Sequence, residues 1–385
     1  MKKILYVTTL VLVLCFSFAS AAFAAPLTLE IDGTVVKPTV DPMIDNGVTL
    51  VPLRFIAETL GAEVNYDAAS RSVTVETAAY TIVFTVGSTS YTVNGAGRTL
   101  LAAPQIVNDS TMVPLRVISE AIGAQVEYIA DTSTVTVSYF TTMSGSVKVS
   151  GSTTVQPIAQ AAADKLMQMN SGLSITVAGG GSGAGINDAQ AGTSNIGLSS
   201  RELTADELQE LTPYIVAQDG IAIIVHPSNP VSNLTKEQAS QLFLGEITNW
   251  ADVGGNNAPV FVQTRETGSG TRSTLEEMLL NRESVLSTAT PSTSSALIKQ
   301  SVAGGVNAIG YDSIGFVDSS VKAVSLDNVA ATTNSVKSGS YLMGRDLLAV
   351  TKGRPSGASA MFIDYLRSKD YQDNFVIQEG YISLY

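Results

Sequence analysis

Two stretches early in the chain share one pattern of apolar and polar positions. The first covers residues 51–75 and reads VPLRFIAETLGAEVNYDAASRSVTV; the second covers residues 113–137 and reads VPLRVISEAIGAQVEYIADTSTVTV. The two are identical at 14 of 25 positions. In each, a proline opens a segment with helical apolar spacing, a glycine ends it, and two alternating stretches follow. Each copy therefore predicts a short helix followed by a β-hairpin, so residues 26–140 are expected to form a small α+β repeat domain with a core of its own.

Beyond residue 146 the pattern changes. Short apolar runs such as LSITVAG and IAIIVHP alternate with stretches of helical spacing. This alternation is typical of an α/β domain, which we expect to cover residues 145–385. The small polar stretch TTMSGS, at 141–146, separates the two patterns and is expected to be a linker.

The start of the chain carries the pattern of a secretory leader. Lys2 and Lys3 precede a fifteen-residue apolar run, and Ala22-Phe23-Ala24 is a small-x-small cleavage site. Residues 1–24 are therefore expected to be a signal peptide that is cleaved near Ala24, leaving an exported protein, extracellular or associated with the cell surface. The single cysteine, Cys15, lies in this leader, so the mature chain is expected to have no disulfide and no thiolate metal site.

Charge and chemistry narrow the classes of function. The formal net charge is −12, and it becomes about −14 once Lys2 and Lys3 are removed, which disfavours nucleic acid and anionic lipid as partners. His226 is the single histidine, and the chain has no G-x-S-x-G motif, no phosphate-binding P-loop motif and no zinc-ligand spacing. A phosphatase built from carboxylates alone would need clustered acids in the Gly/Ser-rich stretches, and these lack them. We therefore expect a binding protein rather than an enzyme.

Four stretches rich in glycine, serine and threonine indicate what is bound. They are SGSTTV (150–155), GGGSGAGI (179–186), IGLSSREL (196–203) and RETGSGTR (265–272). They end predicted strands or open predicted helices, where free N–H groups and the helix dipole favour an anion. One such stretch is ordinary helix capping, but four in one domain, one with two arginines, indicate an oxyanion site. A dinucleotide is not expected, because Ala184 replaces the last glycine of G-x-G-x-x-G.

These stretches, together with LFLGEITNWADVGG, resemble the phosphate-binding protein of phosphate ABC transporters, over residues 145–385. The resemblance implies the two-lobed type II periplasmic-binding-protein-like fold. One lobe would take residues 145–218 and the tail from 341, and the other would take 219–340. Inorganic phosphate would bind in the cleft without metal or cofactor, and the protein would deliver it to a membrane permease. An exported scavenger or sensor that feeds no transporter stays open, as does another oxyanion such as sulfate or molybdate.

The resemblance also implies the ligand groups. Carried over motif by motif, they fall on Ser152, Thr153, Thr154, Ser182, Arg265, Ser269, Gly270 and Thr271. In the third stretch some family members have an aspartate that accepts the proton of hydrogen phosphate, and here Ser200 stands in its place. Two other acids could take that role. We favour Asp219, because pairing with a neighbouring arginine would engage Glu266.

The repeat at 26–140 resembles the copper amine oxidase N-terminal-like domain, a module common on exported proteins of Gram-positive bacteria. The family name brings no copper chemistry with it, because copper sites want imidazole or soft sulfur and residues 26–140 contain neither histidine nor cysteine. The resemblance implies a stalk or a module that contacts cell-wall polymer. A spacer with no partner is the equal alternative.

Overall fold

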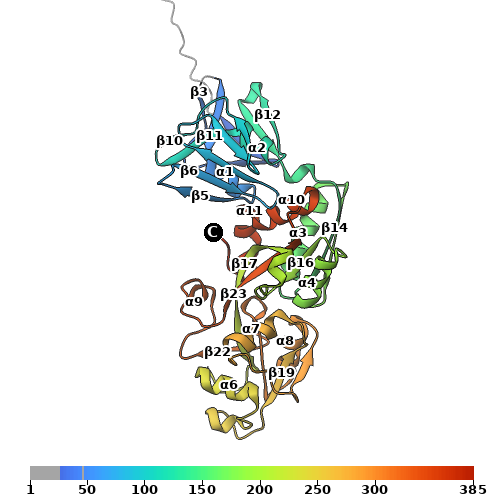
Figure 1. The fold of residues 1–385 in the computed structure, drawn as a ribbon. Coiled ribbons are helices and arrows are strands. Elements are labelled where there is room, and N and C mark those ends of the chain that lie inside the picture. The colour runs from blue at the N-terminus through green and yellow to red at the C-terminus, as the bar shows by residue number, and fades with distance from the viewer. Residues whose placement is uncertain (1–26, 46) are drawn as a thin grey trace, which may run out of the picture.

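The fold is described from a computed structural model, which places residues 27–45 and 47–385. The signal peptide expected at 1–24 lies outside the described residues. Figure 1 shows three bodies in a row, beginning with the N-terminal repeats, which we call the repeat module (27–139). Below it lie lobe 1 (145–218 and 341–385) and lobe 2 (219–340). None of the helices in the described ranges is long and apolar enough to cross a membrane.

The repeat module contains the helix and hairpin that the sequence predicts for each copy. The helices are α1 (Leu53–Thr59) and α2 (Leu115–Ala121), and the glycines after them have φ of +80° and +88°, as a helix C-cap requires. In the described part of the module, the strands form three small sheets, with orders β12-β13-β1-β2, β10-β11-β4-β3 and β5-β6-β7-β8-β9. The strands are β1 (Thr28–Ile31), β2 (Thr34–Val36), β3 (Met43–Asp45), β4 (Val48–Pro52), β5 (Glu63–Asp67), β6 (Ser72–Glu76), β7 (Thr81–Thr85), β8 (Ser90–Val93), β9 (Ala96–Thr99), β10 (Gln105–Val107), β11 (Ser110–Pro114), β12 (Gln125–Ile129) and β13 (Thr134–Ser138).

One sheet runs through both lobes, and two of its strands connect them. Its order over residues 145–385, all of them described, is β15-β14-β16-β23-β17-β21-β19-β20, with β22 and β18 joined beside β17. The long strand β17 pairs with β23 in lobe 1 and continues into lobe 2, where it pairs with β21 and β22. The strands are β14 (Gly145–Gly151), β15 (Leu173–Gly179), β16 (Ile196–Ser199), β17 (Leu211–Val225), β18 (Asn233–Leu234), β19 (Phe261–Arg265), β20 (Thr290–Ser292), β21 (Ala308–Ser313), β22 (Lys322–Leu326) and β23 (Gly344–Lys352).

Helices pack on this sheet in both lobes, as expected for an α/β domain. Lobe 1 carries α3 (Gln156–Met169), α4 (Ser182–Ala191), α5 (Glu207–Glu210), α10 (Gly357–Arg367) and α11 (Lys369–Tyr371). Lobe 2 carries α6 (Lys236–Leu244), α7 (Gly270–Met278), α8 (Ser295–Gly304) and α9 (Thr333–Lys337). The short 3₁₀-helices are η1 (Ala130–Thr132), η2 (Phe140–Thr142), η3 (Trp250–Val253) and η4 (Ile314–Phe316), and η5 (Gln372–Val376) is a π-helix. The sequence predicts α3 well: its apolar positions are buried, and its proline lies in the first turn.

The segment at 141–146, expected to be a linker, is exposed apart from Met143, but it is anchored at its start. Asp32 accepts hydrogen bonds from the backbone N–H groups of Tyr139 (2.8 Å), Phe140 (3.1 Å) and Thr141 (3.1 Å), which fixes the turn η2. Met143 is buried, and its N–H donates to the Asn170 side chain (2.9 Å). Polar side chains distant in sequence therefore supply partners that the stretch itself does not reveal.

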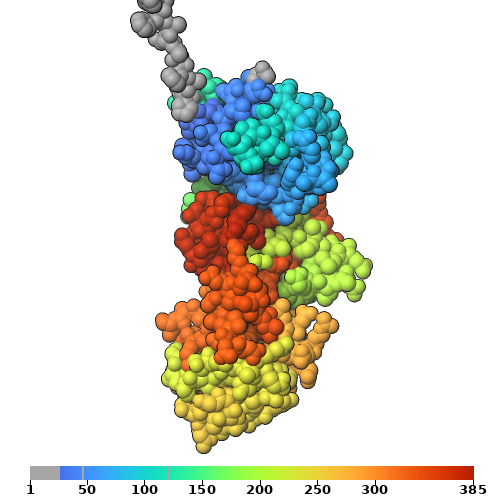
Figure 2. Space-filling view, turned by 90° about the vertical axis from the view of Figure 1, so that its left-hand side faces the viewer, coloured from blue at the N-terminus to red at the C-terminus, as the bar shows by residue number. Residues whose placement is uncertain are grey.

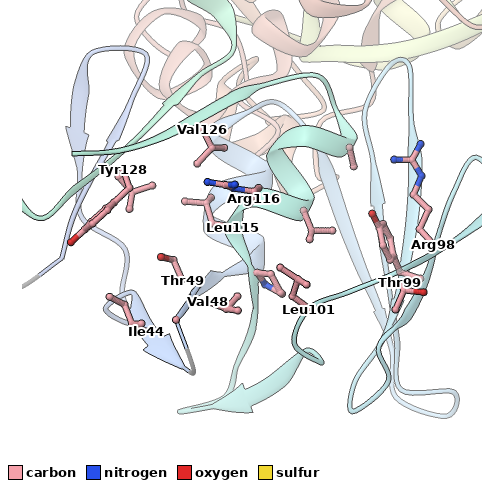
Figure 3. Close-up of a pocket in the computed structure, with 16 residues that line it drawn as sticks. Ile44, Val48, Thr49, Arg98, Thr99, Leu101, Leu115, Arg116, Val126 and Tyr128 are labelled. Carbon is pink, nitrogen blue, oxygen red and sulfur yellow. The ribbon is translucent and has the colours of Figure 1, made fainter. Parts of the chain in front are cut away.

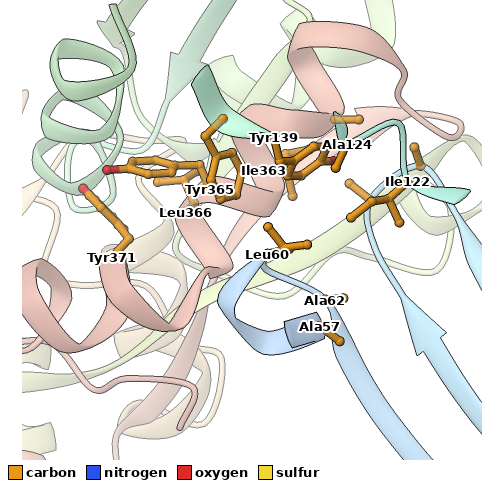
Figure 4. Close-up of a cluster of buried hydrophobic side chains, with 14 of the residues drawn as sticks. Ala57, Leu60, Ala62, Ile122, Ala124, Tyr139, Ile363, Tyr365, Leu366 and Tyr371 are labelled. Atoms are coloured by element: carbon orange, nitrogen blue, oxygen red, sulfur yellow. The ribbon is translucent and has the colours of Figure 1, made fainter. Parts of the chain in front are cut away.

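The core of the repeat module continues into lobe 1, which its sequence does not indicate. Most of the module's buried apolar residues belong to one cluster with those of lobe 1. Figure 4 shows Leu60 and Tyr139 of this cluster beside the α10 side chains, including Leu366. In Figure 2 the module is seated directly on the red C-terminal part of lobe 1. A Cβ on Gly61 would come within 1.8 Å of the Asp364 carbonyl oxygen, so the backbones touch here.

Candidate functional site

The starts of helices from both lobes meet between the lobes. Thr154 precedes α3 of lobe 1, and its hydroxyl oxygen lies 3.1 Å from the Thr271 hydroxyl of α7 and 3.2 Å from the Ser295 hydroxyl of α8. All three side chains are buried. The starts of three helices and their hydroxyls therefore converge at one contact between the lobes, where the helix dipoles favour an anion.

Arg265, the last residue of β19, brings a positive charge to this space. The residue is only 1 % exposed. Its Nη2 donates to the Thr153 hydroxyl of lobe 1 (3.1 Å), and its Nη1 donates to the Ser295 hydroxyl of lobe 2 (3.2 Å). Nε and Nη2 also donate to the two carboxylate oxygens of Glu266, each at 3.0 Å. The pairing that the sequence analysis expected for Glu266 is therefore present.

Arg272 points elsewhere. Its Nε donates to Glu276 one turn along α7 (2.8 Å), and its Nη1 donates to the Arg265 backbone oxygen (3.2 Å). About a fifth of its side chain is exposed (21 %). It therefore supports the loop that carries Arg265 rather than joining the interlobe hydroxyls.

The starts of α4 and α7 touch each other. Ser182 accepts a hydrogen bond from the Ser200 N–H (3.0 Å), and the two hydroxyl oxygens lie 3.3 Å apart. A Cβ on Gly270 would stand 2.3 Å from the Ser182 hydroxyl oxygen, so a glycine is needed where the lobes approach. The second, third and fourth Gly/Ser-rich stretches thus come together in space.

Two of the expected site residues use their hydroxyls locally. The Ser152 oxygen accepts from the Thr154 N–H (3.2 Å) in the turn before α3, and the Ser269 oxygen caps α7 by accepting from the Arg272 N–H (3.3 Å). Both are buried beside the other groups. Their side chains shape the helix starts in this structure, and their backbone N–H groups are engaged as well, Ser152 with the Leu198 oxygen (2.9 Å) and Ser269 with the Glu266 oxygen (3.2 Å).

Asp219 lies beside the site, but its carboxylate is already engaged. Arg345 donates to its Oδ2 from Nη2 (2.7 Å) and Nε (3.0 Å), and the Ser313 hydroxyl donates to its Oδ1 (2.7 Å). The remaining nitrogen of Arg345 donates to the Ser200 backbone oxygen and the Thr271 hydroxyl, each at 3.0 Å. Arg345 therefore links both lobes and both crossing strands.

Arg345 and Ser295 were not predicted from the sequence as parts of this site. A charged residue that opens the apolar strand GRDLLAV was the available signal for Arg345. Its pairing follows from the register of β17 with β23, in which Asp219 stands opposite Arg345. The sequence around Ser295 is that of an ordinary helix start, with Ser294 as the N-cap, and it contains no signal for an anion site.

The repeat module has a groove of its own, with a volume of about 640 Å³. Figure 3 shows it lined by the second repeat together with side chains of β3, β4 and β9, with Leu101 and Tyr128 on its walls. Its lining includes no acid, histidine or cysteine, and the described residues hold no group of His, Cys, Asp or Glu that could bind a metal ion. The module's residues therefore do not fit a copper centre.

Two α/β lobes, joined by paired strands around a space lined by helix starts and a buried arginine, define a solute-binding domain of the periplasmic-binding-protein type. Comparison with known families agrees: residues 136–370 match the PBP superfamily domain, and residues 30–137 match the copper amine oxidase N-terminal domain. The phosphate-binding protein PstS of Bacillus subtilis is 33 % identical over 243 residues, covering 62 % of this chain and 81 % of that protein. The chain belongs to the PBP superfamily and, within it, to the PstS family.

Solved structures of relatives support the same assignment. A putative phosphate ABC transporter substrate-binding protein from Clostridium perfringens, with bound phosphate, is 41 % identical with a TM-score of 0.60. The match covers 63 % of this chain and all of that one. An ABC-type phosphate transport receptor from Vibrio cholerae is 35 % identical with a TM-score of 0.53, covering 62 % of this chain and all of that one. In both cases the chain spans the relative completely, and the repeat module is additional.

Proposed function

We propose that this protein captures one inorganic phosphate between its lobes and delivers it to the permease of a phosphate ABC transporter. The observation that carries the proposal is the buried Arg265 guanidinium, which bonds to Thr153 of lobe 1 and Ser295 of lobe 2. A planar guanidinium with several donors suits a tetrahedral oxyanion. Support also comes from relatives 33–41 % identical that are named for phosphate binding or phosphate transport.

In this proposal the hydroxyls that now contact one another turn to the phosphate oxygens. Thr154 and Thr271 are 3.1 Å apart across the lobes, so a bound anion could take a hydrogen bond from each. Backbone N–H groups at the starts of α4 and α7 would add donors without adding net charge. Glu266 and Asp219 balance the two arginines, so the site would rely on dipoles as much as on charge.

The proposal includes export and retention at the cell surface. Its support is the leader pattern at 1–24 and the match of residues 30–137 to a separate module family. The module would hold the binding domain at the surface through contact with cell-wall polymer. Because the module packs on lobe 1, it would hold lobe 1 in a fixed orientation at the surface and leave lobe 2 able to move about the crossing strands.

Isothermal titration tests the binding claim. The mature chain, stripped of bound ligand, is titrated with phosphate, sulfate and molybdate. We expect heat from phosphate with one site per chain, and no measurable heat or thermal shift with phosphate would refute the proposal. Uptake of phosphate by vesicles that contain the permease, with and without the protein, separates a transport protein from a scavenger that feeds no transporter.

A further inference from the structure

Selection of phosphate over sulfate requires a hydrogen-bond acceptor in the site. Near neutral pH phosphate carries a proton and sulfate does not, so a cleft made of donors alone would hold both anions. The two acids that the sequence indicated are engaged by arginines: Asp219 by Arg345, and Glu266 by Arg265. Both carboxylates therefore already have strong donors, and an acid without such a partner would be the stronger acceptor for a ligand.

Asp312, in β21, has an unpaired carboxylate oxygen. The residue is 1 % exposed, and its Oδ1 accepts from the Ser313 N–H (2.9 Å). Its Oδ2 is buried with no hydrogen-bond partner, and within the described part of the chain it is the single carboxylate oxygen in that condition. A buried acceptor without a donor costs free energy, so its presence calls for an explanation.

The surroundings of Asp312 are those of the interlobe site. The Ser295 hydroxyl lowers the pKa of the Asp312 carboxyl as a nearby side-chain donor, although it does not complete a hydrogen bond to Oδ2. The same hydroxyl contacts the Arg265 guanidinium and Thr154. On its own strand, Ser313 connects Asp312 to Asp219. The Ser295 side chain therefore lies between Asp312 and Arg265, the arginine proposed to bind phosphate.

The charged and titratable groups around Asp312 come from several elements. Burial is the largest influence on Asp312 and raises its pKa to about 7, against the lowering by the Ser313 N–H, Arg265 of β19, the Ser295 hydroxyl and Arg345 of β23. Asp219 of β17 and Tyr381 of the C-terminal segment complete the cluster. The carboxyl group can therefore exchange its proton in the pH range where phosphate does so.

We propose that Asp312 is the selectivity residue of the site, whose unpaired Oδ2 accepts the hydrogen bond of protonated phosphate and repels sulfate. The proposal rests on the proposed function. A phosphate hydroxyl would supply the donor that Oδ2 lacks, whereas sulfate would place an oxygen lone pair against it. Sites with such a mismatch discriminate by roughly 10⁴-fold.

Substitution of the three acids tests this assignment. Asp312→Asn, with Asp219→Asn and Glu266→Gln as matched variants, is titrated with phosphate and with sulfate at neutral pH. We expect Asp312→Asn to bind phosphate more weakly and sulfate more tightly, narrowing the phosphate-to-sulfate ratio by at least about 100-fold. The other two variants should change the affinity for both anions in parallel and keep the phosphate-to-sulfate ratio, because each alters the charge beside an arginine and leaves Asp312 in place. A wild-type ratio in Asp312→Asn overturns the assignment.

The wild-type protein provides a second readout that does not depend on the variant folding. Sulfate keeps its charge as pH falls from about 8 to about 5.5, so its affinity reports on the protein alone. Protonated Asp312 would donate to sulfate, and we expect tighter sulfate binding at lower pH in the wild type and a flat profile in Asp312→Asn. A flat wild-type profile contradicts the assignment. Failure of the wild type to bind phosphate would instead remove the proposed function, and this inference with it.

Discussion

The side chain of Arg265 contacts both lobes. Its guanidinium bonds to Thr153 on one side and to Ser295 on the other, while Glu266 holds it in place. Both the charge and the position of the donors depend on this arrangement. Loss of the side chain would remove the charge-assisted bonds to phosphate and leave Glu266 without its partner.

We expect Arg265→Ala to weaken phosphate binding by about 2–5 kcal/mol, the usual loss when one partner of a buried charge pair is truncated. Arg272→Ala is the comparison variant, because its guanidinium bonds to Glu276 and to the Arg265 backbone oxygen and makes no bond to the interlobe hydroxyls. Titration of both variants with phosphate, after circular dichroism confirms their folding, gives the comparison. Small and equal effects would place the anion elsewhere.

The candidate site could be predicted from sequence where its signals are local. Thr154, Ser182 and Thr271 stand at helix starts that glycine and serine mark within a few residues. The partner of Asp219 could not be predicted, because Arg345 is 126 positions away and meets it only through the register of two crossing strands. Long-range pairing of buried charges depends on tertiary structure that local pattern does not contain.

At the scale of elements, the two copies of the repeat make different contacts with lobe 1. Gly61 and Gly123 end equivalent helices with φ of +80° and +88°. A Cβ at Gly61 would meet the Asp364 backbone oxygen of α10 at 1.8 Å, whereas a Cβ at Gly123 would meet nothing within 4 Å. The first copy therefore forms the closest contact with lobe 1.

This difference makes a matched pair of variants. Both Gly61→Ala and Gly123→Ala impose strain at positive φ, but only the first forces the module and α10 apart. We expect Gly61→Ala to lower the free energy of unfolding by about 1–3 kcal/mol more than Gly123→Ala, as for overpacking in a core. Chemical denaturation of the full mature chain measures it. Equal destabilisation would mean that the module does not rest on α10 as described.

The elements of the module were predictable, but its attachment was not. Helical spacing, the proline and the glycine act within one repeat, so the sequence predicts helix and hairpin correctly. The linker was predicted from small polar residues at 141–146, yet Asp32 and Asn170 bind this region from afar. Polarity alone does not show whether a segment is free when distant side chains can satisfy its backbone.

At the scale of the whole molecule, the two lobes are closed on each other. Their contact includes Thr154 with Thr271, and the Gly183 N–H, which donates to the Gly268 oxygen (2.9 Å). Strands β17 and β23 cross between the lobes and are the natural position for a hinge. Binding and closure are then a single coupled equilibrium, in which any group that holds the lobes apart lowers affinity.

Gly270→Ala tests this coupling, since its Cβ would lie 2.3 Å from the Ser182 oxygen of the opposite lobe. We expect phosphate affinity to fall at least about tenfold, or about 1.4 kcal/mol. In the presence of phosphate, small-angle scattering should give a larger radius of gyration for Gly270→Ala than for the wild type. Gly304→Ala, in open space at the end of α8, is the control and should leave both quantities unchanged. Wild-type values of phosphate affinity and radius of gyration in Gly270→Ala would show that lobe closure and phosphate binding are not coupled as described.

A crystal structure of the mature chain grown with phosphate tests the central claim most directly. The account predicts one phosphate between the lobes, within hydrogen-bonding distance of the Arg265 guanidinium and of the Thr154 and Thr271 hydroxyls that now contact each other. Phosphate bound elsewhere, or an interlobe space in which Arg265 keeps its bonds to Thr153 and Ser295 while phosphate is absent at saturating concentration, would contradict it.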